Sequence, residues 1–287
     1  MGGAKCTLLK GRVAHLDGTL SSLGNSTGRN YFDGSELLVA MKCYFDGSEG
    51  QHQDGDTWIT LAGFATSDAA WKVFNDRWER MLRERYPVAP YIHMWEIYSG
   101  TDPFERGPAG WNETLVDALV FDALNILQQM DKGEFRSFLC SVNLSGRDRL
   151  IGEGYKVSDP ITICVEMCVG LFIQWSMDKE LDLHYLFFDR GEKFVDDFKS
   201  RWLKERTPPG KITPGGVSLF WDLIADIQEV DMERNPPIQA ADMLAWGKTR
   251  SFSDKSARHL NEIMGRIIPS ATATITEDIM RQKSVKV

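Results

Sequence analysis

The sequence predicts a single α/β domain with a mixed central sheet flanked by helices. Apolar, β-branched and aromatic segments of strand length alternate with longer segments whose apolar residues recur at helical spacing. No internal repeat and no linker interrupts residues 41–265. Alternating strands and helices of this kind pack as layers around one core, so we expect one domain rather than two.

Composition supports a globular protein and limits its partners. The 287 residues are 43% hydrophobic and include 9 Trp, 15 Phe and 7 Tyr, which excludes a disordered polymer. The formal net charge of -8 gives no overall attraction for nucleic acid. Any phosphate-binding surface therefore has to be a local basic patch, which counts mildly against a nuclease.

Cysteine and apolar patterns indicate a cytoplasmic protein. The 5 cysteines form neither a paired framework nor a zinc knuckle, as is typical of buried thiols in a reducing compartment. The longest apolar stretch, residues 161–177, contains Glu166 and Gln174, which favours a buried helix over a membrane span. The N-terminus shows no signal peptide. We expect no membrane partner.

The first elements are two strands that follow a polar extension. Residues 1–38 are rich in Gly, Ser, Thr and Asn, and we expect them to be disordered or to lie outside the core. Residues 39–45 and 57–66 are typical of strands. The first strand runs into Asp46 and then into Gly47, and we expect it to end there.

The remaining elements follow from periodicity and capping residues. Ser67 or Asp68 begins a first helix and Asn112 a second. Residues 91–100 favour a short strand or an extended turn. The later pattern predicts a strand over 135–144, an apolar helix over 160–178, a buried strand over 182–189, and helices over 193–206 and 238–250. Residues 266–287 predict a ragged tail, which bounds the domain at 39–265.

Three carboxylates are the strongest site candidates. Asp46 and Asp189 follow apolar strands, and active sites of open α/β sheets lie at the carboxyl ends of strands. Asp242 lies inside an apolar helix, where an unpaired charge is costly to bury, so it needs a cation or a partner. Each also has an ordinary structural interpretation: a turn residue, a helix N-cap and a first-turn carboxylate, respectively.

Four ordered motifs resemble one protein family. The motifs "YFDGSEG", "YIHMWEIYSG", "YLFFDRGE" and "VDMERNPPIQAADMLAW" are similar to landmarks of the bacterial domain-of-unknown-function family numbered 3800. The most specific is the "IQAADMLA" helix with Asp231 about eleven positions upstream of Asp242. The similarity spans roughly residues 41–250, and it implies a ribonuclease H-like fold.

The resemblance implies a metal-dependent site. Ribonuclease H-like enzymes place carboxylates on the first strand, a middle strand and a late helix, so that two cations lie about 4 Å apart. Asp46, Asp189 and Asp242 occupy those positions here, and Mg²⁺ or Mn²⁺ suits their oxygen ligands. One cation helps to form the attacking hydroxide and the other stabilises the leaving oxygen.

A fourth metal ligand is less clearly marked. Glu96 is the first choice, with His93 near enough to tune it or to shuttle a proton. His93 also suits a packed or exposed imidazole at a strand end. Glu49 and Glu166 are alternatives to Glu96.

A local basic run is the candidate contact for a phosphate backbone. Most such runs are solvated helix faces, but this one carries Trp202 and is joined by the later Lys248 and Arg250. Its cations are Lys199, Arg201, Lys204, Arg206 and Lys211.

The leading hypothesis is a metal-dependent phosphodiesterase acting on nucleic acid. The alternative is a catalytically decayed binding or regulatory protein of a mobile-element or defence system. It follows from departures from the family pattern, because Met232 and Glu233 replace an expected Ser-Lys pair. A small-molecule hydrolase that uses the same carboxylates is a third hypothesis.

Overall fold

The computed structural model describes residues 40–52, 55–85, 87–107, 110–179, 183–206, 219–251, 260–265 and 270–286. The predicted extension at 1–38 and the basic residue Lys211 lie outside the described residues.

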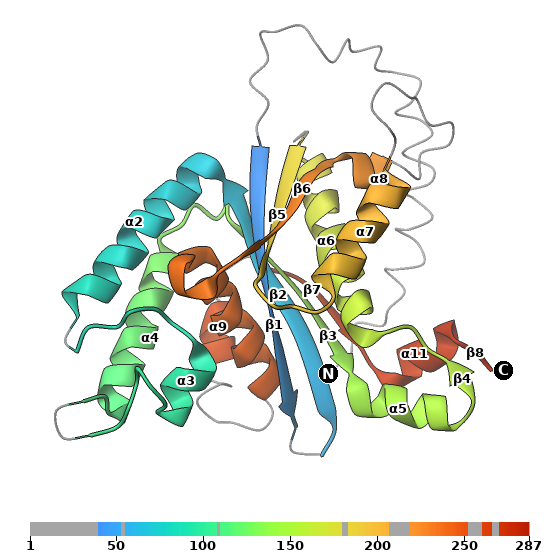
Figure 1. Ribbon diagram of the computed structural model, residues 1–287, viewed down its shortest axis with the longest axis horizontal. Coiled ribbons are helices and arrows are strands. Elements are labelled where there is room, and N and C mark those ends of the chain that lie inside the picture. Colours follow the sequence, from blue (N-terminus) through green and yellow to red (C-terminus); the bar gives the residue numbers. More distant parts are fainter. Residues whose placement is uncertain are drawn as a thin grey trace, which may run out of the picture.

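A six-stranded mixed sheet forms the centre of the domain (Figure 1). Its strand order is β6-β5-β1-β2-β3-β7. β1, β2 and β3 are antiparallel neighbours, β5 and β6 run parallel to β1, and β7 runs parallel to β3. The strands are β1 (Ala40–Gln51), β2 (Thr57–Ser67), β3 (Arg136–Asn143), β5 (Leu183–Asp189), β6 (Ile224–Val230) and β7 (Ser270–Ile275).

Helices cover both faces of this sheet, which makes a three-layered domain (Figure 1). One layer contains α2 (Asp68–Glu84), α3 (Met94–Ser99), α4 (Glu113–Gln128) and α9 (Pro236–Arg250). The other contains α5 (Leu144–Gly152), α6 (Pro160–Met177), α7 (Val195–Glu205), α8 (Leu219–Asp222) and α11 (Glu277–Lys283). The turn η1 (Met232–Arg234) precedes α9, and β4 (Tyr155–Lys156) pairs with β8 (Val285–Lys286). The predicted fold class, a mixed sheet flanked by helices, is confirmed.

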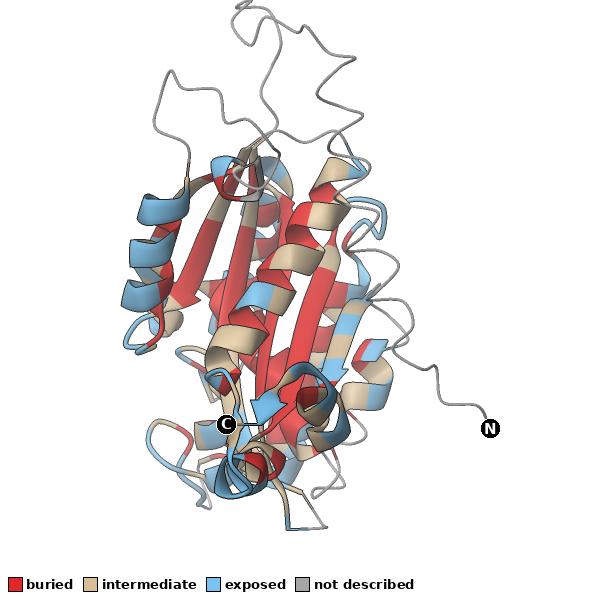
Figure 2. Ribbon diagram, turned by 90° about the vertical axis from the view of Figure 1, so that its right-hand side faces the viewer, coloured by how far each residue is buried: buried red, intermediate tan, exposed pale blue. Residues whose placement is uncertain are grey.

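Strand alternation sorts the core into two halves. Successive side chains of a strand point to opposite faces, so Cys43 and Phe45 of β1 pack with α6 and α7, while Tyr44 packs with α2 and α9. Figure 2 shows buried residues along the inner strands of the sheet. Asp46, the next residue after Phe45, therefore points toward the α9 layer.

Two predicted helix starts are confirmed by their caps. The Ser67 hydroxyl accepts a hydrogen bond from the Ala70 amide at 3.3 Å at the start of α2. The Asn112 side chain accepts one from the Leu115 amide at 3.1 Å at the start of α4. Each cap satisfies an amide that the first helical turn would leave unpaired.

The prediction that the first strand ends at Asp46 is wrong. β1 continues to Gln51, and Gly47, Glu49 and Gly50 pair with β2 as regular partners. The turn-forming composition is overridden by this antiparallel neighbour, which supplies the hydrogen bonds that hold the segment extended. Pairing with β5 does stop just before Asp46, so one edge of β1 becomes open at that residue.

The prediction of a strand or extended turn over residues 91–100 is also wrong. Residues Met94–Ser99 form α3, which His93 precedes as N-cap. Gly100 ends the helix with a left-handed φ of 70°, and its amide bonds to the Glu96 carbonyl at 2.9 Å. The aromatic and β-branched composition suggested a strand, but a glycine C-cap is the local signal for the end of a helix.

The C-terminal segment is part of the domain, which corrects the predicted ragged tail at 266–287. β7 extends the sheet beside β3, and α11 packs against α5. Ile275 and Met280 are buried in the core on the α6 side. The strand was missed because its alternating Ser, Ala and Thr residues suit an edge strand without forming an apolar run.

α6 is the one helix of the described ranges that is long and apolar enough to cross a bilayer. In this structure it packs on β2 and β3 and contributes Cys164, Cys168 and Phe172 to the core. This packing agrees with the prediction of a buried helix.

The packing of β7 predicts a stability effect in a segment that the sequence assigned to a tail. We expect Ile275→Ala to lower the free energy of unfolding by about 2–4 kcal/mol, because a buried aliphatic side chain is lost. The exposed neighbour Thr274→Ala should change it by less than about 0.5 kcal/mol. Urea unfolding measures both. Two neutral substitutions would mean that β7 does not pack as described.

Candidate functional site

Asp46 and Asp189 stand side by side on neighbouring strands. The parallel register pairs Tyr44 with Phe187 and Phe45 with Phe188, so the next residue along each strand is an aspartate. Both aspartates follow the residue that packs on the α6 side, and both therefore point toward the α9 layer. Asp46 is only 4% exposed.

Asp242 reaches the same face of the sheet from α9. This helix packs against β1 and β2, and Asp242 is 5% exposed on it. Its Oδ2 accepts a hydrogen bond from the Met94 amide at 2.6 Å. α9 begins at Pro236, so Asp242 lies well past the first turn, and its interpretation as a first-turn carboxylate is wrong.

Gln239 fixes the geometry one turn before Asp242. Its side-chain oxygen accepts hydrogen bonds from Trp78 Nε1 at 2.8 Å and from the Ile92 amide at 3.0 Å. Residues 92 and 94 are thus both bound to α9 through backbone amides. This double attachment holds the start of α3, with His93 and Glu96, beside Asp242.

Asp189 is held by the turn before α9. Its Oδ1 accepts a hydrogen bond from the Met232 amide at 3.1 Å. The interpretation of Asp189 as a helix N-cap is wrong, because α7 begins at Val195 with Phe194 as its N-cap. Backbone amides thus hold both carboxylates in place: Met94 binds Asp242 Oδ2, and Met232 binds Asp189 Oδ1.

Glu96 and His93 both lie at the site, as predicted. His93 Nδ1 is 3.3 Å from Glu96 Oε1, and Glu96 also bonds to the Tyr91 side chain. Glu96 Oε2 is buried without a hydrogen-bond partner among the described residues. An unsatisfied buried carboxylate oxygen is costly, and it is an available ligand.

Sequence reasoning missed Glu192. This side chain is partly buried beside Asp46 and Asp189, and it accepts a hydrogen bond from the Gly47 backbone. A Cβ at Gly47 would lie 2.8 Å from Glu192 Oε1, so glycine leaves room for the carboxylate. The available signal was Gly191, whose φ of 92° turns the chain back after β5.

Two predicted alternatives do not join the site. Glu49 is exposed, and alternation along β1 places it on the opposite face from Asp46. Glu166 is exposed on α6, in the opposite layer, where it forms an ion pair with Arg201. Of the three candidates for a fourth ligand, the structure brings only Glu96 to the aspartates.

Burial and mutual repulsion raise the pKa values of the clustered carboxylates. Burial, followed by the charges of Asp242, Asp189 and Glu192, raises the pKa of Asp46 well above its usual value. Burial raises the pKa of Asp242 to about 6, although His93 acts in the opposite direction. Burial is also the main cause of the raised pKa values of Asp189 and Glu192.

No described Lys or Arg neutralises this cluster, and the described residues do not form a complete set of metal ligands. Within the described ranges, no Lys or Arg forms an ion pair with Asp46, Asp189 or Asp242. The same residues also contain no set of three His, Cys, Asp or Glu side chains placed to hold a metal ion. The aspartates are therefore neighbours, but they do not form a preassembled coordination sphere.

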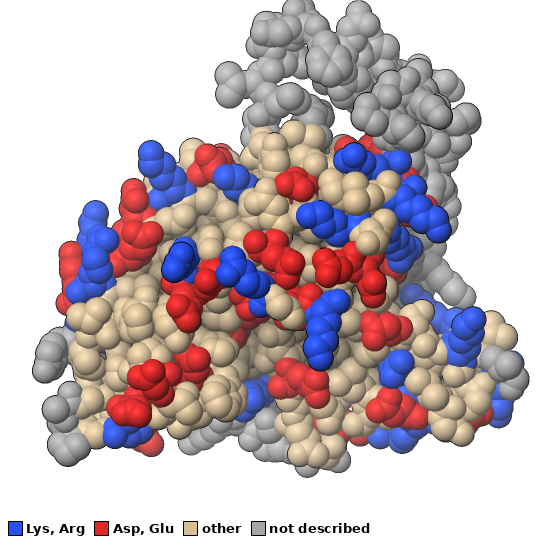
Figure 3. All heavy atoms as spheres, in the orientation of Figure 1, with Lys and Arg blue, Asp and Glu red and all other residues tan. Residues whose placement is uncertain are grey.

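The predicted basic run does not form one surface beside the site. Arg201 and Arg206 belong to or follow α7, in the layer opposite α9, and lie over the Trp221 and Trp202 rings, respectively. Lys248 and Arg250 lie on α9. Figure 3 shows acidic and basic side chains intermixed over the middle of the face that carries η1 and the turn after β5.

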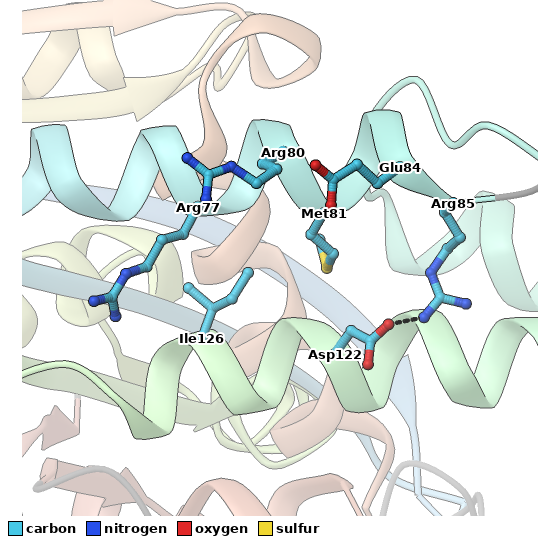
Figure 4. A pocket seen from close by; sticks show the side chains of 7 residues that line it. All are labelled: Arg77, Arg80, Met81, Glu84, Arg85, Asp122 and Ile126. Atoms are coloured by element: carbon cyan, nitrogen blue, oxygen red, sulfur yellow. Dashed lines mark hydrogen bonds and ion pairs between the residues drawn. The ribbon is translucent and has the colours of Figure 1, made fainter.

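An open groove between α2 and α4 is a separate feature (Figure 4). It is lined by Arg77, Arg80, Met81, Glu84, Arg85, Asp122 and Ile126. Arg85 bonds to Asp122 and to the Ala118 carbonyl, and Arg77 bonds to Gln129. Arg85 and Asp122 thus neutralise each other within the groove, and none of the carboxylates above lines it.

Comparison with known proteins identifies no family. No protein-family model matches the chain, and no curated protein matches it in sequence. Among solved structures, ribonuclease HII in its complex with PCNA from Archaeoglobus fulgidus is similar over 79% of this chain and 81% of that chain, at 11% identity and a TM-score of 0.36. Similarity at this level does not establish a shared activity.

The raised pKa values predict how stability depends on pH without metal. The folded protein binds protons at these carboxylates more tightly than the unfolded chain does. The contribution of Asp242 is therefore full below the ordinary Asp value of 3.8 and is lost as pH rises through its folded pKa of about 6. We expect the free energy of unfolding to fall across this window, by on the order of 1–3 kcal/mol from Asp242.

Urea unfolding at several pH values in EDTA measures this dependence. Asp242→Asn should flatten the fall, whereas Glu166→Gln, in the opposite layer, should leave the wild-type slope unchanged. A wild-type protein that gains stability across the window, or an Asp242→Asn profile parallel to it, would contradict the raised pKa values.

Proposed function

We propose that this protein is a divalent-metal-dependent phosphodiesterase acting on nucleic acid. The observation that carries the proposal is the meeting of Asp46, Asp189 and Asp242, from β1, β5 and α9, on one face of the sheet without a described Lys or Arg partner. Buried like charges of this kind require protons or a cation. Membership of the domain-of-unknown-function family 3800 is part of the same proposal and rests on the four sequence motifs.

The available ligands suit a hard cation. Asp46, Asp189, Asp242 and Glu96 offer oxygen only, the ligand type that Mg²⁺ and Mn²⁺ prefer. The buried, unpaired Oε2 of Glu96 supports its place in this set. Glu192 is a further candidate ligand, because it lies partly buried beside Asp46 and Asp189. A bound divalent cation would supply an activated water and charge stabilisation for the leaving oxygen.

Protein groups around the aspartates have distinct roles in this proposal. The Met94 and Met232 amides would orient the Asp242 and Asp189 carboxylates at the site. His93, 3.3 Å from Glu96 and partly exposed, is placed to accept or donate a proton at Nδ1 or Nε2. Gly47 leaves the space that Glu192 occupies.

A catalytically decayed binding or regulatory protein is the second candidate. The specific observation in its favour is that no three ligand side chains of the described residues are placed to hold a metal ion. Repulsion among metal-free carboxylates accounts for the same spacing, since like charges separate until a cation arrives. Metal binding distinguishes the two candidates.

Thermal melting with and without Mn²⁺ tests the proposal. At a Mn²⁺ concentration about 100-fold above Kd, we expect the wild-type Tm to rise by roughly 5–10 °C. Asp46→Asn and Asp242→Asn should lose this shift and any hydrolysis of single-stranded or hybrid nucleic acid. Without metal, both variants should be at least as stable as wild type, because each substitution removes a repelled charge.

Glu166→Gln is the matched control, since it neutralises an exposed carboxylate in the opposite layer. It should retain the Mn²⁺ shift. The metal-site proposal fails if both Asn variants melt earlier than wild type without metal and keep the full Mn²⁺ response. A wild-type protein without any saturable metal response would favour the decayed binding protein.

A further inference from the structure

Trp95 is the one exposed tryptophan of this protein. All 9 tryptophans lie in the described residues, and the other eight are buried or partly buried. The Trp95 residue is 50% exposed. Isolated exposed apolar side chains are common on protein surfaces, so exposure alone gives Trp95 no role. A role for Trp95 follows instead from its position relative to the carboxylates.

The backbone places Trp95 at the edge of the carboxylate site. Its neighbour Met94 donates its amide to Asp242 Oδ2 at 2.6 Å. Consecutive Cα atoms are about 3.8 Å apart, so the Trp95 Cα lies within about 8 Å of that carboxylate oxygen. The residue also stands between His93 and Glu96, which both belong to the site.

α3 holds Trp95 on a rigid support. Met94 and Ile97 on either side of it are fully buried. The helix is fixed at its end by a 2.7 Å hydrogen bond from Arg106 Nη2 to the Ile97 carbonyl, and Tyr98 stacks on Trp246 of α9 at 4.6 Å between ring centroids. An exposed ring on so well-anchored a helix loses little backbone entropy when it binds a ligand.

We propose that Trp95 stacks on an unpaired base of single-stranded nucleic acid whose phosphodiester lies at the carboxylate site. The inference rests on the proposed function and adds its substrate class. Indole faces stack on every base, and a base in a duplex is already stacked on both sides, so this contact selects unpaired strands.

The test compares Trp95→Ala and Trp95→Phe with Phe121→Ala, which removes an aromatic ring that is 59% exposed on α4. Binding of a 20-nucleotide single strand is measured in Ca²⁺, with strand integrity checked, and KM and kcat are measured in Mn²⁺. We expect Trp95→Ala to weaken binding and raise KM by roughly 5- to 150-fold, with a smaller change in kcat. Trp95→Phe should retain most of the affinity, and Phe121→Ala all of it.

Fluorescence gives an independent measurement. The emission difference between wild type and Trp95→Phe isolates Trp95, and it should be quenched by the single strand but not by an abasic strand of equal length. Duplex affinity should not respond to Trp95→Ala. All three variants should keep the wild-type Mn²⁺ shift in Tm, since none removes a carboxylate.

The outcomes separate this inference from the proposed function. Unchanged strand affinity in Trp95→Ala, or binding without quenching of Trp95, overturns the stacking role while the metal-dependent activity stands. A wild-type protein that binds no single strand in Ca²⁺ or Mn²⁺ also overturns it. Loss of the Mn²⁺ response in wild type instead contradicts the proposed function, and Trp95-dependent binding in that case supports a binding protein that uses the same ring.

Discussion

The parallel register between β1 and β5 is the constraint on which the rest of the site depends. Tyr44 stacks on Phe187 on one face of the sheet, and Phe45 stacks on Phe188 on the other, with ring centroids 4.5 and 5.4 Å apart. Both faces are buried, so a slip of one residue would exchange the two apolar sets and is strongly disfavoured. The same slip would separate Asp46 from its neighbour, because β-strand side chains alternate between faces. Core packing therefore brings the two charges together.

α9 converts this pair into a wider site through two polar residues one turn apart. Gln239 and Asp242 bind the amides of Ile92 and Met94, so the start of α3 is fixed to α9 by backbone atoms. Buried polar side chains with satisfied hydrogen bonds specify one arrangement of the elements around them. Asp242 thus has a structural function in addition to its charge, and a substitution that preserves its shape, such as Asn, separates the two roles.

Local patterns sufficed to predict the fold class and to bring together most residues of the candidate site. The strands before Asp46 and Asp189, the caps Ser67 and Asn112, and the late helix carrying Asp242 all follow from short-range signals. Those signals are visible in sequence because apolar periodicity and capping chemistry act within a few residues.

The features that the sequence did not predict depend on partners far along the chain. β1 continues past Gly47 because β2 pairs with it, and β7 is a strand because β3 accepts it. Pairing between β1 and β5 stops just before Asp46, although β1 continues. Glu192 joins the site because its side chain lies beside the edge of β1 that is left open there. Glu49 was a plausible ligand only while the first strand was expected to end at Asp46. Because β1 in fact continues past Asp46, Glu49 and Asp46 lie on opposite faces of the sheet.

The charge distribution constrains how such a site can bind a polyanion. The net charge is -8, and the basic residues of the predicted patch are divided between two layers of the domain. A protein that binds nucleic acid through many Lys and Arg contacts releases many counterions, and its affinity falls steeply with salt. The basic residues of the predicted patch do not form one continuous surface of that kind. Under the proposed function, affinity therefore has to come from cations at the carboxylates and from uncharged contacts such as the Trp95 ring, and a shallow dependence on monovalent salt follows from that division.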